Sequence, residues 1–235
     1  MRKVGIYYAF WTHDWDVDFR PFIKKVGKLG FDQLELNGGT IVEMDLKKQR
    51  ELKSMADDEN LSLSYGIGLQ KQYDVSSLDE KVRQRGIDFM KKMIDSVANM
   101  GGGMIGGTIH GCWPSTMPVE LDSKQPIWDQ SIKSMKELAP YAGERNVLLN
   151  IEVLNRFEQF IINDSREAVS YVKEVDHPSC RILLDTFHMN IEEDSFGEAI
   201  RNVGPYLAAF HLGETNRKPP GMGRMPWGEI KEALD

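Results

Sequence analysis

The sequence of 235 residues is 41% hydrophobic and 28% charged, with a formal net charge of −7 and a pI of about 5.4. These values are typical of a globular protein, and the acidic balance argues against nucleic acid or an anionic membrane as the main partner. The apolar run after Met1 is short and lacks a cleavage site, and no segment is long enough to span a membrane. The two cysteines, Cys112 and Cys180, provide no disulfide framework, so we expect a cytoplasmic protein.

Short apolar runs alternate with amphipathic helical patterns along the whole chain. The runs are of strand length, and the helical segments carry apolar residues spaced three and four apart. Met90 and Met93 lie on one such helical face and are expected to fill the core. The predicted strands are residues 4–9, 31–36, 61–67, 104–109, 147–153, 181–185 and 206–211. The predicted helices are residues 22–29 and 46–59, two that include residues 90–97 and 132–142, and three that begin after residues 164 and 195 and near 227.

This alternation predicts an α/β fold, a (β/α)8 TIM barrel that forms a single domain over residues 1–235. A complete barrel of this kind has eight strands, whereas about seven βα units can be counted here. We therefore expect this chain to be C-terminally truncated, with the eighth strand and the closing helix missing. The first and seventh strands would then each carry an unpaired edge.

Three consecutive predicted strands end in residues that can bind a metal, namely Glu152, Asp185 and His211. Each of them alone has an ordinary interpretation, as a strand exit, a helix cap or a satisfied core histidine. One βα unit separates each from the next, so all three should lie side by side at the carboxyl end of the barrel, where active sites of this fold are built. Oxygen and nitrogen donors without thiolate favour Mn²⁺, Mg²⁺ or Co²⁺ over a structural zinc ion.

The loops after these strands each supply a second polar residue: Glu158, His188 and Arg217. Such groups could hydrogen-bond a polyhydroxylated substrate and fix its orientation. The alternative is ordinary loop solvation, which for Arg217, close to Lys218 and Arg224, is the simpler interpretation.

Aromatic residues are expected around the same end of the barrel. Tyr7 ends the first predicted strand, Trp15 follows it, and Trp113 follows the fourth. Aromatic faces commonly pack against the C–H surface of a sugar, although aromatics in such loops also serve ordinary packing.

Long motifs in this sequence closely resemble those of the ketose 3-epimerases, the D-tagatose 3-epimerase and D-psicose (D-allulose) 3-epimerase group of sugar isomerase/epimerase TIM barrels. The resemblance covers essentially the whole chain. The motifs are residues 5–11 (GIYYAFW), 152–158 (EVLNRFE), 184–194 (LDTFHMNIEED) and 211–227 (HLGETNRKPPGMGRMPW).

The resemblance implies a metal-dependent isomerase, a homodimer or homotetramer, that inverts C3 of free ketohexoses, interconverting D-fructose with D-psicose and D-tagatose with D-sorbose. The metal would be Mn²⁺, with Co²⁺ or Mg²⁺ as alternatives, held by Glu152, Asp185 and His211. Glu152 would also be the catalytic acid/base. The substrate would contact Tyr7, Thr108, Trp113, Glu158, His188 and Arg217. The family also carries a second catalytic glutamate on the eighth strand, which we expect beyond Asp235.

These metal ligands and the catalytic glutamate suit the removal of a proton from the carbon next to a ketone. A divalent ion on the ketone oxygen and its neighbouring hydroxyl would stabilise a cis-enediolate, and delivery of the proton to the opposite face would invert the centre. The alternatives are a non-catalytic sugar- and metal-binding barrel and a related sugar isomerase. A barrel-type metal-dependent endonuclease is disfavoured because the sequence has no basic stripe.

Overall fold

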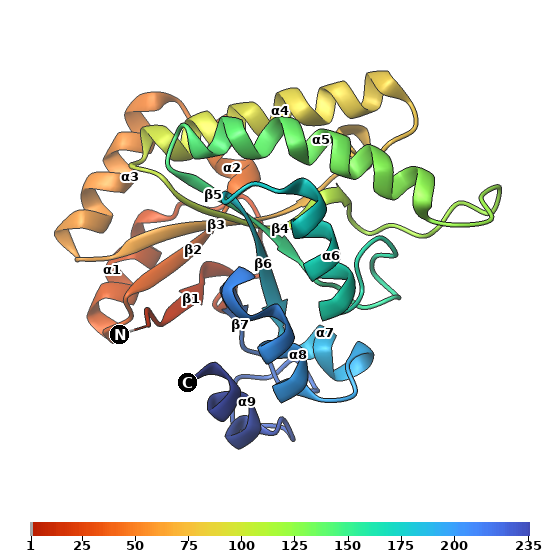
Figure 1. The fold of residues 1–235 in the computed structure, drawn as a ribbon. Coiled ribbons are helices and arrows are strands. Elements are labelled where there is room, and N and C mark those ends of the chain that lie inside the picture. Colours follow the sequence, from red (N-terminus) through yellow and green to blue (C-terminus); the bar gives the residue numbers. More distant parts are fainter. Residues whose placement is uncertain (1) are drawn as a thin grey trace.

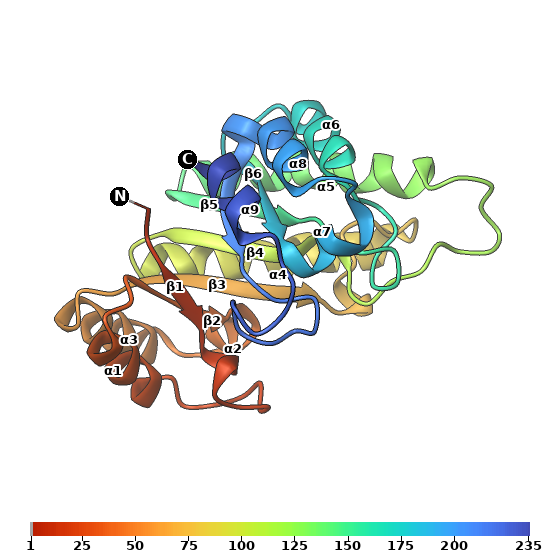
Figure 2. The same ribbon diagram turned by 90° about the horizontal axis from the view of Figure 1, so that it is seen from below.

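Seven strands alternate with helices in the computed structural model, which describes residues 2–235 (Figure 1). All seven strands are parallel, and their order in the sheet is their order in the chain. The strands are β1 (Gly5–Tyr7), β2 (Gln33–Asn37), β3 (Ser62–Leu69), β4 (Gly103–Cys112), β5 (Val147–Glu152), β6 (Cys180–Asp185) and β7 (Leu207–His211). The sheet is curled, with helices around its outside (Figure 2), and the prediction of a TIM-barrel fold is confirmed.

The long helices are amphipathic and return the chain from the end of one strand to the start of the next. The helices are α1 (Arg20–Leu29), α2 (Gly38–Glu43), α3 (Leu46–Asp58), α4 (Glu80–Asn99), α5 (Gln125–Gly143), α6 (Ser165–Val175), α7 (Thr186–Glu192), α8 (Phe196–Val203) and α9 (Trp227–Leu234). Within residues 2–235, none of these helices has the length and apolarity needed to cross a bilayer.

Helices α2 and α7 were not predicted from the sequence. Each follows its strand directly and is too short to show a helical repeat of apolar residues. Both begin with a side-chain cap: Asn37 accepts a hydrogen bond from the backbone N–H of Thr40, and Asp185 accepts one from the N–H of Phe187. The cap at Asp185 matters for the site, because it orients a carboxylate that was predicted to bind a metal.

Every strand differs from its predicted bounds by one to three residues, and two of these differences concern predicted site residues. The first strand is shorter, because a 3₁₀ turn over Tyr8–Phe10 follows Tyr7 directly. The fourth strand is longer and continues to Cys112, so Thr108 lies inside β4 rather than near its end. Tyr7 still ends β1 and Trp113 still follows β4, as predicted.

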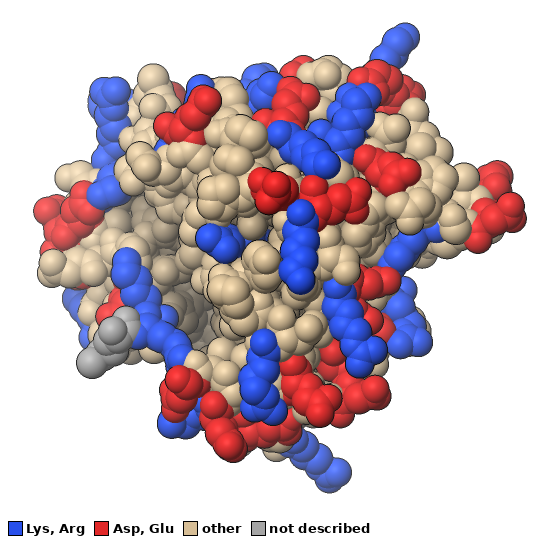
Figure 3. Space-filling view, viewed as in Figure 1, with Lys and Arg blue, Asp and Glu red and all other residues tan. Residues whose placement is uncertain are grey.

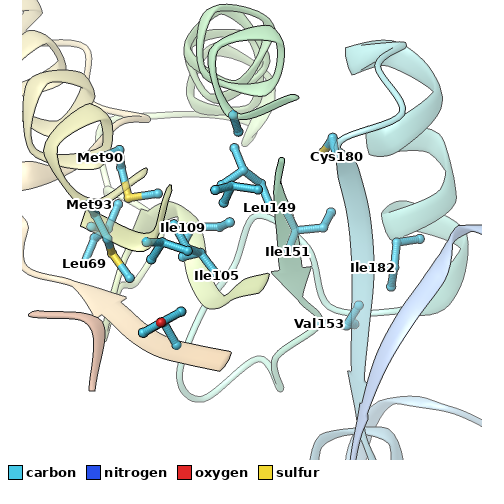
Figure 4. Packing of buried hydrophobic residues seen from close by; sticks show 14 of the residues in the cluster. Leu69, Met90, Met93, Ile105, Ile109, Leu149, Ile151, Val153, Cys180 and Ile182 are labelled. Carbon is cyan, nitrogen blue, oxygen red and sulfur yellow. The ribbon is translucent and has the colours of Figure 1, made fainter. Parts of the chain in front are cut away.

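The hydrophobic core lies between the outer face of the sheet and the helices. Met90 and Met93 of α4 are fully buried beside Ile105 and Ile109 of β4 (Figure 4), which confirms their prediction as core residues. Methionine suits this place because its flexible thioether fills irregular gaps between helix and sheet. Cys112 and Cys180 are both buried and form no disulfide.

Strands β1 and β7 form the two edges of the sheet within residues 2–235. The two ends of the described chain meet nearby, where Nη1 of Arg2 lies 3.0 Å from Oδ1 of Asp235. The face of the molecule in Figure 3 is hollowed on one side and carries interspersed acidic and basic side chains, without a broad basic area.

Candidate active site

Glu152, Asp185 and His211 are the last residues of β5, β6 and β7, and the structure brings their side chains together. Nδ1 of His211 lies 3.6 Å from Oε1 of Glu152 and 4.0 Å from Oδ2 of Asp185. Asp185 and His211 are register partners across β6 and β7, so both side chains leave the sheet on the same face. The three strand ends therefore form one cluster at the carboxyl end of the barrel.

The cluster has the chemistry of a divalent cation site. Besides the predicted His211, His188 also lies beside the two carboxylates: Glu152, Asp185 and His188 each offer one ligand atom, and these atoms all lie within 4.8 Å of one another. Only 15% of the Glu152 side chain and 9% of the Asp185 side chain are exposed. Two poorly hydrated carboxylates so close together repel each other unless positive charge lies between them. Carboxylate oxygens with an imidazole nitrogen fit Mn²⁺, Mg²⁺ or Co²⁺.

Two imidazoles, those of His188 and His211, lie beside the carboxylates of Glu152 and Asp185, and their hydrogen bonds give them different capabilities. Nδ1 of the buried His188 accepts a hydrogen bond from the backbone N–H of Asn155 at 3.2 Å. The same nitrogen lies 2.7 Å from the side-chain Nδ2 of Asn155. A neutral ring with Nδ1 occupied in this way carries its proton on Nε2. Nε2 of His188 can then act as a hydrogen-bond donor, and its predicted role in substrate binding stays a prediction.

In His211, unlike His188, Nδ1 faces carboxylates, those of Glu152 and Asp185. Its Nε2 lies 3.4 Å from Oε2 of Glu35, a residue of β2 that sequence analysis did not select. Burial lowers the pKa of His211, but the carboxylates of Glu35 and Glu152 outweigh burial and hold this pKa well above its usual range. For Glu35 burial acts in the other direction and raises the pKa. The adjacent His211 more than reverses this effect, so the pKa of Glu35 is lowered.

A signal for Glu35 was present in the sequence of β2. Gln33, Glu35 and Asn37 alternate with the fully buried Leu34 and Leu36, so the strand has one polar face and one apolar face. In a barrel whose apolar face packs against helices, the polar face points to the inside. Alternation of this kind identifies an inward-facing acid but cannot identify its partner.

Glu158 lies in the loop after β5, and its carboxylate is fixed from two sides. Its Oε2 accepts the indole N–H of Trp113 at 3.0 Å, and its Oε1 accepts Nδ2 of Asn155 at 2.9 Å and lies 3.9 Å from Nδ1 of His188. Burial raises the pKa of Glu158, but these hydrogen bonds outweigh it and lower the pKa below its usual value. The side chain is therefore an anchored anion beside the cluster.

Arg217 is brought to the cluster by the long loop of residues 213–226. Its Nη1 lies 3.4 Å from Oδ2 of Asp185, and its guanidinium carbon lies 4.0 Å from the centroid of the Phe187 ring. The backbone at Arg217 is left-handed, with φ of 61°. Solvation was the simpler interpretation of this residue from sequence, but the loop places it against a predicted metal ligand.

The loop is held in shape by Glu214, which sequence analysis also missed. Glu214 is fully buried, and its carboxylate accepts the N–H of Gly221 at 2.6 Å, the N–H of Met225 at 3.0 Å and the indole N–H of Trp227 at 2.7 Å. Burial raises the pKa of Glu214, and these three donors reverse the shift and lower it. A single buried carboxylate therefore fastens both halves of the loop that carries Arg217.

Three further residues were predicted near the site: Tyr7, Thr108 and Trp15. Burial raises the pKa of Tyr7, with further contributions from Tyr8, Glu35 and Glu152, so the phenol stays protonated near the cluster. Thr108 is buried on β4, beside Gly68 of β3. Trp15 is 59% exposed and holds the N-terminal loop through its carbonyl oxygen, which accepts the hydroxyl of Tyr8 at 3.1 Å.

Comparison with known proteins matches residues 23–235 to the family described as "Xylose isomerase-like TIM barrel". The chain is 42% identical to D-psicose 3-epimerase of Agrobacterium fabrum, covering 99% of this chain and 80% of the relative, and 42% identical to that of Ruminiclostridium cellulolyticum, covering 99% and 79%. The structure of a D-psicose 3-epimerase in the presence of D-fructose superposes with a TM-score of 0.95 at 42% identity, over 99% of this chain and 80% of that one. The enzyme from Clostridium cellulolyticum H10 with D-tagatose has a TM-score of 0.95 at 41% identity, over the same shares.

Proposed function

The chain belongs to the xylose isomerase-like TIM-barrel family, and on that premise we propose that it inverts C3 of free ketohexoses, with D-fructose and D-psicose as one substrate pair and D-tagatose and D-sorbose as another. The resemblance to the ketose 3-epimerases predicted from the sequence motifs is confirmed. The observation that carries the proposal is the convergence of Glu152, Asp185 and His211 at three neighbouring strand ends. Relatives whose structures were determined with D-fructose and D-tagatose support the substrate class.

Glu152, Asp185 and His211 are the proposed metal ligands, with Mn²⁺ as the proposed ion and Co²⁺ or Mg²⁺ as alternatives. When bound, the ion would supply positive charge next to the substrate oxygens on which negative charge develops. Hydrogen bonds within the chain orient two of these side chains towards the proposed metal position. Oδ1 of Asp185 is fixed by the N–H of Phe187 at 2.7 Å, which leaves Oδ2 facing the cluster. Nδ1 of His211 faces the same point.

Glu152 is the proposed catalytic base, because its carboxylate lies in the cluster and can accept the proton from C3 on one face of the sugar. Inversion also needs a proton delivered to the opposite face, which is the role of the second catalytic glutamate that the family resemblance implies. His188 would hold a sugar oxygen by donating from Nε2, and the anchored Glu158 would accept a sugar hydroxyl. Arg217 would add a donor from the loop after β7. Tyr7, Thr108 and Trp113 would line the remaining walls. Such fixed donors and acceptors align C3 with Glu152 and exclude other orientations.

Two further features are proposed from the family resemblance. The chain would assemble as a homodimer or homotetramer, and it would work in the cytoplasm on a free sugar rather than on a nucleic acid or at a membrane. The scattered charges on the face in Figure 3 are compatible with a small neutral substrate.

The proposal is tested by incubating the purified, Mn²⁺-loaded protein with D-fructose and measuring D-psicose by chromatography. D-Tagatose and its product D-sorbose provide the second substrate pair, and protein treated with a chelator provides the control. We expect product only with metal. A folded, metal-loaded protein that forms no product, and that incorporates no solvent deuterium at C3, would instead be a sugar- and metal-binding barrel without turnover.

A further inference from the structure

Glu35 of β2 lies inside the barrel next to the metal cluster and has no part in the proposed reaction. Its side chain is 17% exposed, and its Oε2 lies 3.4 Å from Nε2 of His211. The same Oε2 accepts the hydroxyl of Ser64 at 3.3 Å, and Oγ of Ser64 in turn accepts Nε2 of Gln33 at 2.7 Å. An inward-facing acid is costly to bury, and this one is held by a chain of contacts that ends at a proposed metal ligand.

The two nitrogens of His211 face different partners. Nε2 faces Glu35, whereas Nδ1 faces Glu152 and Asp185. Carboxylates face both nitrogens, so the ring alone does not decide which of them keeps a proton. With a cation at Nδ1, the one remaining ring proton would lie on Nε2, where Glu35 can only accept it. A carboxylate behind a ligating histidine fixes the tautomer and the orientation of the ring and raises its basicity.

We propose that Glu35 is a positioning residue that holds His211 in the tautomer and orientation needed to bind a divalent cation through Nδ1. The inference rests on the proposed function, since it assumes that Glu152, Asp185 and His211 hold a metal. It assigns a role to a residue 176 positions away from His211 in the chain, on a strand that contributes no metal ligand.

The absence of a side chain at Gly66 of β3 leaves room for the carboxylate of Glu35. A Cβ atom at Gly66 of β3 would lie 2.9 Å from Oε1 of Glu35, closer than real contacts allow. The atom that must give way is the end of a flexible side chain, so an alanine at this position would displace the Glu35 carboxylate rather than the backbone. Gly66→Ala therefore perturbs the proposed contact without changing Glu35 itself.

A competing interpretation is that Glu35 only stabilises the fold, through an ion pair with a protonated His211. The two roles predict different results. A structural role lowers the melting temperature of the metal-free protein and leaves the metal affinity of the folded protein unchanged. A positioning role weakens metal binding even in variants that remain folded.

The test is a Mn²⁺ titration by calorimetry of folded wild type, Glu35→Ala, Glu35→Gln and Gly66→Ala, with the Co²⁺ absorption spectrum as a report on ligand geometry. We expect Glu35→Ala to weaken Mn²⁺ binding by about 10- to 100-fold, the usual loss when such a supporting carboxylate is removed. Glu35→Gln should lose less, because its amide oxygen can still accept from Nε2 of His211. Gly66→Ala should fall between wild type and Glu35→Ala, and its Co²⁺ spectrum should change.

Glu51→Gln is the matched control, since it removes a glutamate charge from the exposed surface of α3. Its Mn²⁺ affinity should equal that of wild type. Wild-type affinity in both Glu35→Ala and Gly66→Ala would overturn the inference while leaving the proposed function intact. A wild-type protein that binds no Mn²⁺ and no Co²⁺ would overturn both. If Glu35→Ala does not fold, Glu35→Gln and Gly66→Ala decide the result.

Discussion

Asp185 and His211 are register partners on β6 and β7, and Oδ2 of Asp185 lies 4.0 Å from Nδ1 of His211. The other oxygen of Asp185 caps the first turn of α7 by accepting the N–H of Phe187 at 2.7 Å. One carboxylate therefore starts a helix and faces the cluster at the same time. The cap fixes the direction of the oxygen that is proposed to bind the metal.

We predict that Asp185→Asn weakens Mn²⁺ binding and removes the rise in melting temperature that Mn²⁺ gives to the wild type. Asparagine can still cap α7 through its amide oxygen, but it lacks the charge that a divalent cation requires. The affinity should fall by at least about 100-fold, more than for a residue that only supports a ligand. Calorimetric titration and thermal melts measure both quantities. Asp194→Asn, at an exposed position, is the control, and an unchanged titration in Asp185→Asn would show that Asp185 is not a ligand.

Glu152→Gln should abolish turnover. The amide can neither accept the C3 proton nor bind the cation as an anion, and loss of a general base typically costs about 10²- to 10⁴-fold in rate. Solvent deuterium at C3 of D-fructose, followed by NMR, reads out proton removal directly. Glu144→Gln, an exposed substitution just before β5, should exchange at the wild-type rate. Equal exchange in Glu152→Gln would exclude this residue as the base.

Glu214→Gln should raise KM for the ketohexose and leave the Mn²⁺ affinity unchanged. An amide cannot accept all three donors that the Glu214 carboxylate accepts, and each unpaired buried donor costs roughly 1–3 kcal/mol. The loop that carries Arg217 should then lose its fixed shape, and we expect a KM about tenfold higher.

Steady-state kinetics of Glu214→Gln, Arg217→Ala and the double variant check this relationship. If Glu214 acts through Arg217, the double variant should be little worse than Arg217→Ala alone. Fully additive effects on KM would show that the two residues act independently.

His110 of β4 should make the protein less stable as the pH falls below neutrality. The ring is fully buried, both of its nitrogens lack a hydrogen-bond partner within residues 2–235, and burial lowers its pKa to about 3. An unfolded histidine has a pKa of about 6.5. Between these values the unfolded chain binds a proton that the native chain does not, so the free energy of unfolding decreases with falling pH, by up to about 1.4 kcal/mol per pH unit. Above pH 6.5 the residue has no such effect.

Urea unfolding of the metal-free protein at pH 7, 6 and 5 measures this dependence. His110→Phe should lose less stability over that range than the wild type, whatever its stability at pH 7. His13→Gln, which removes an exposed histidine, is the control and should follow the wild type. Parallel pH dependences in wild type and His110→Phe would contradict the assignment to His110.

The sequence by itself determined the order of strands and helices and the identity of three residues at the strand ends. Parallel strands have carboxyl ends on one side, so local periodicity and spacing were sufficient to place Glu152, Asp185 and His211 together. Short capped helices such as α2 and α7 carry no periodic pattern, and for that reason they were missed.

Only the tertiary structure decided which polar groups face one another. Glu35 meets His211 because the sheet curls and brings β2 opposite β7, and nothing near either residue in the sequence encodes that distance. In the sequence Glu214 resembles a solvated loop residue, but the structure buries it as the acceptor of three hydrogen bonds within the loop that carries Arg217 to Asp185. Local sequence specifies which way a side chain leaves its own strand, whereas its partner depends on strand register and curvature across the whole sheet.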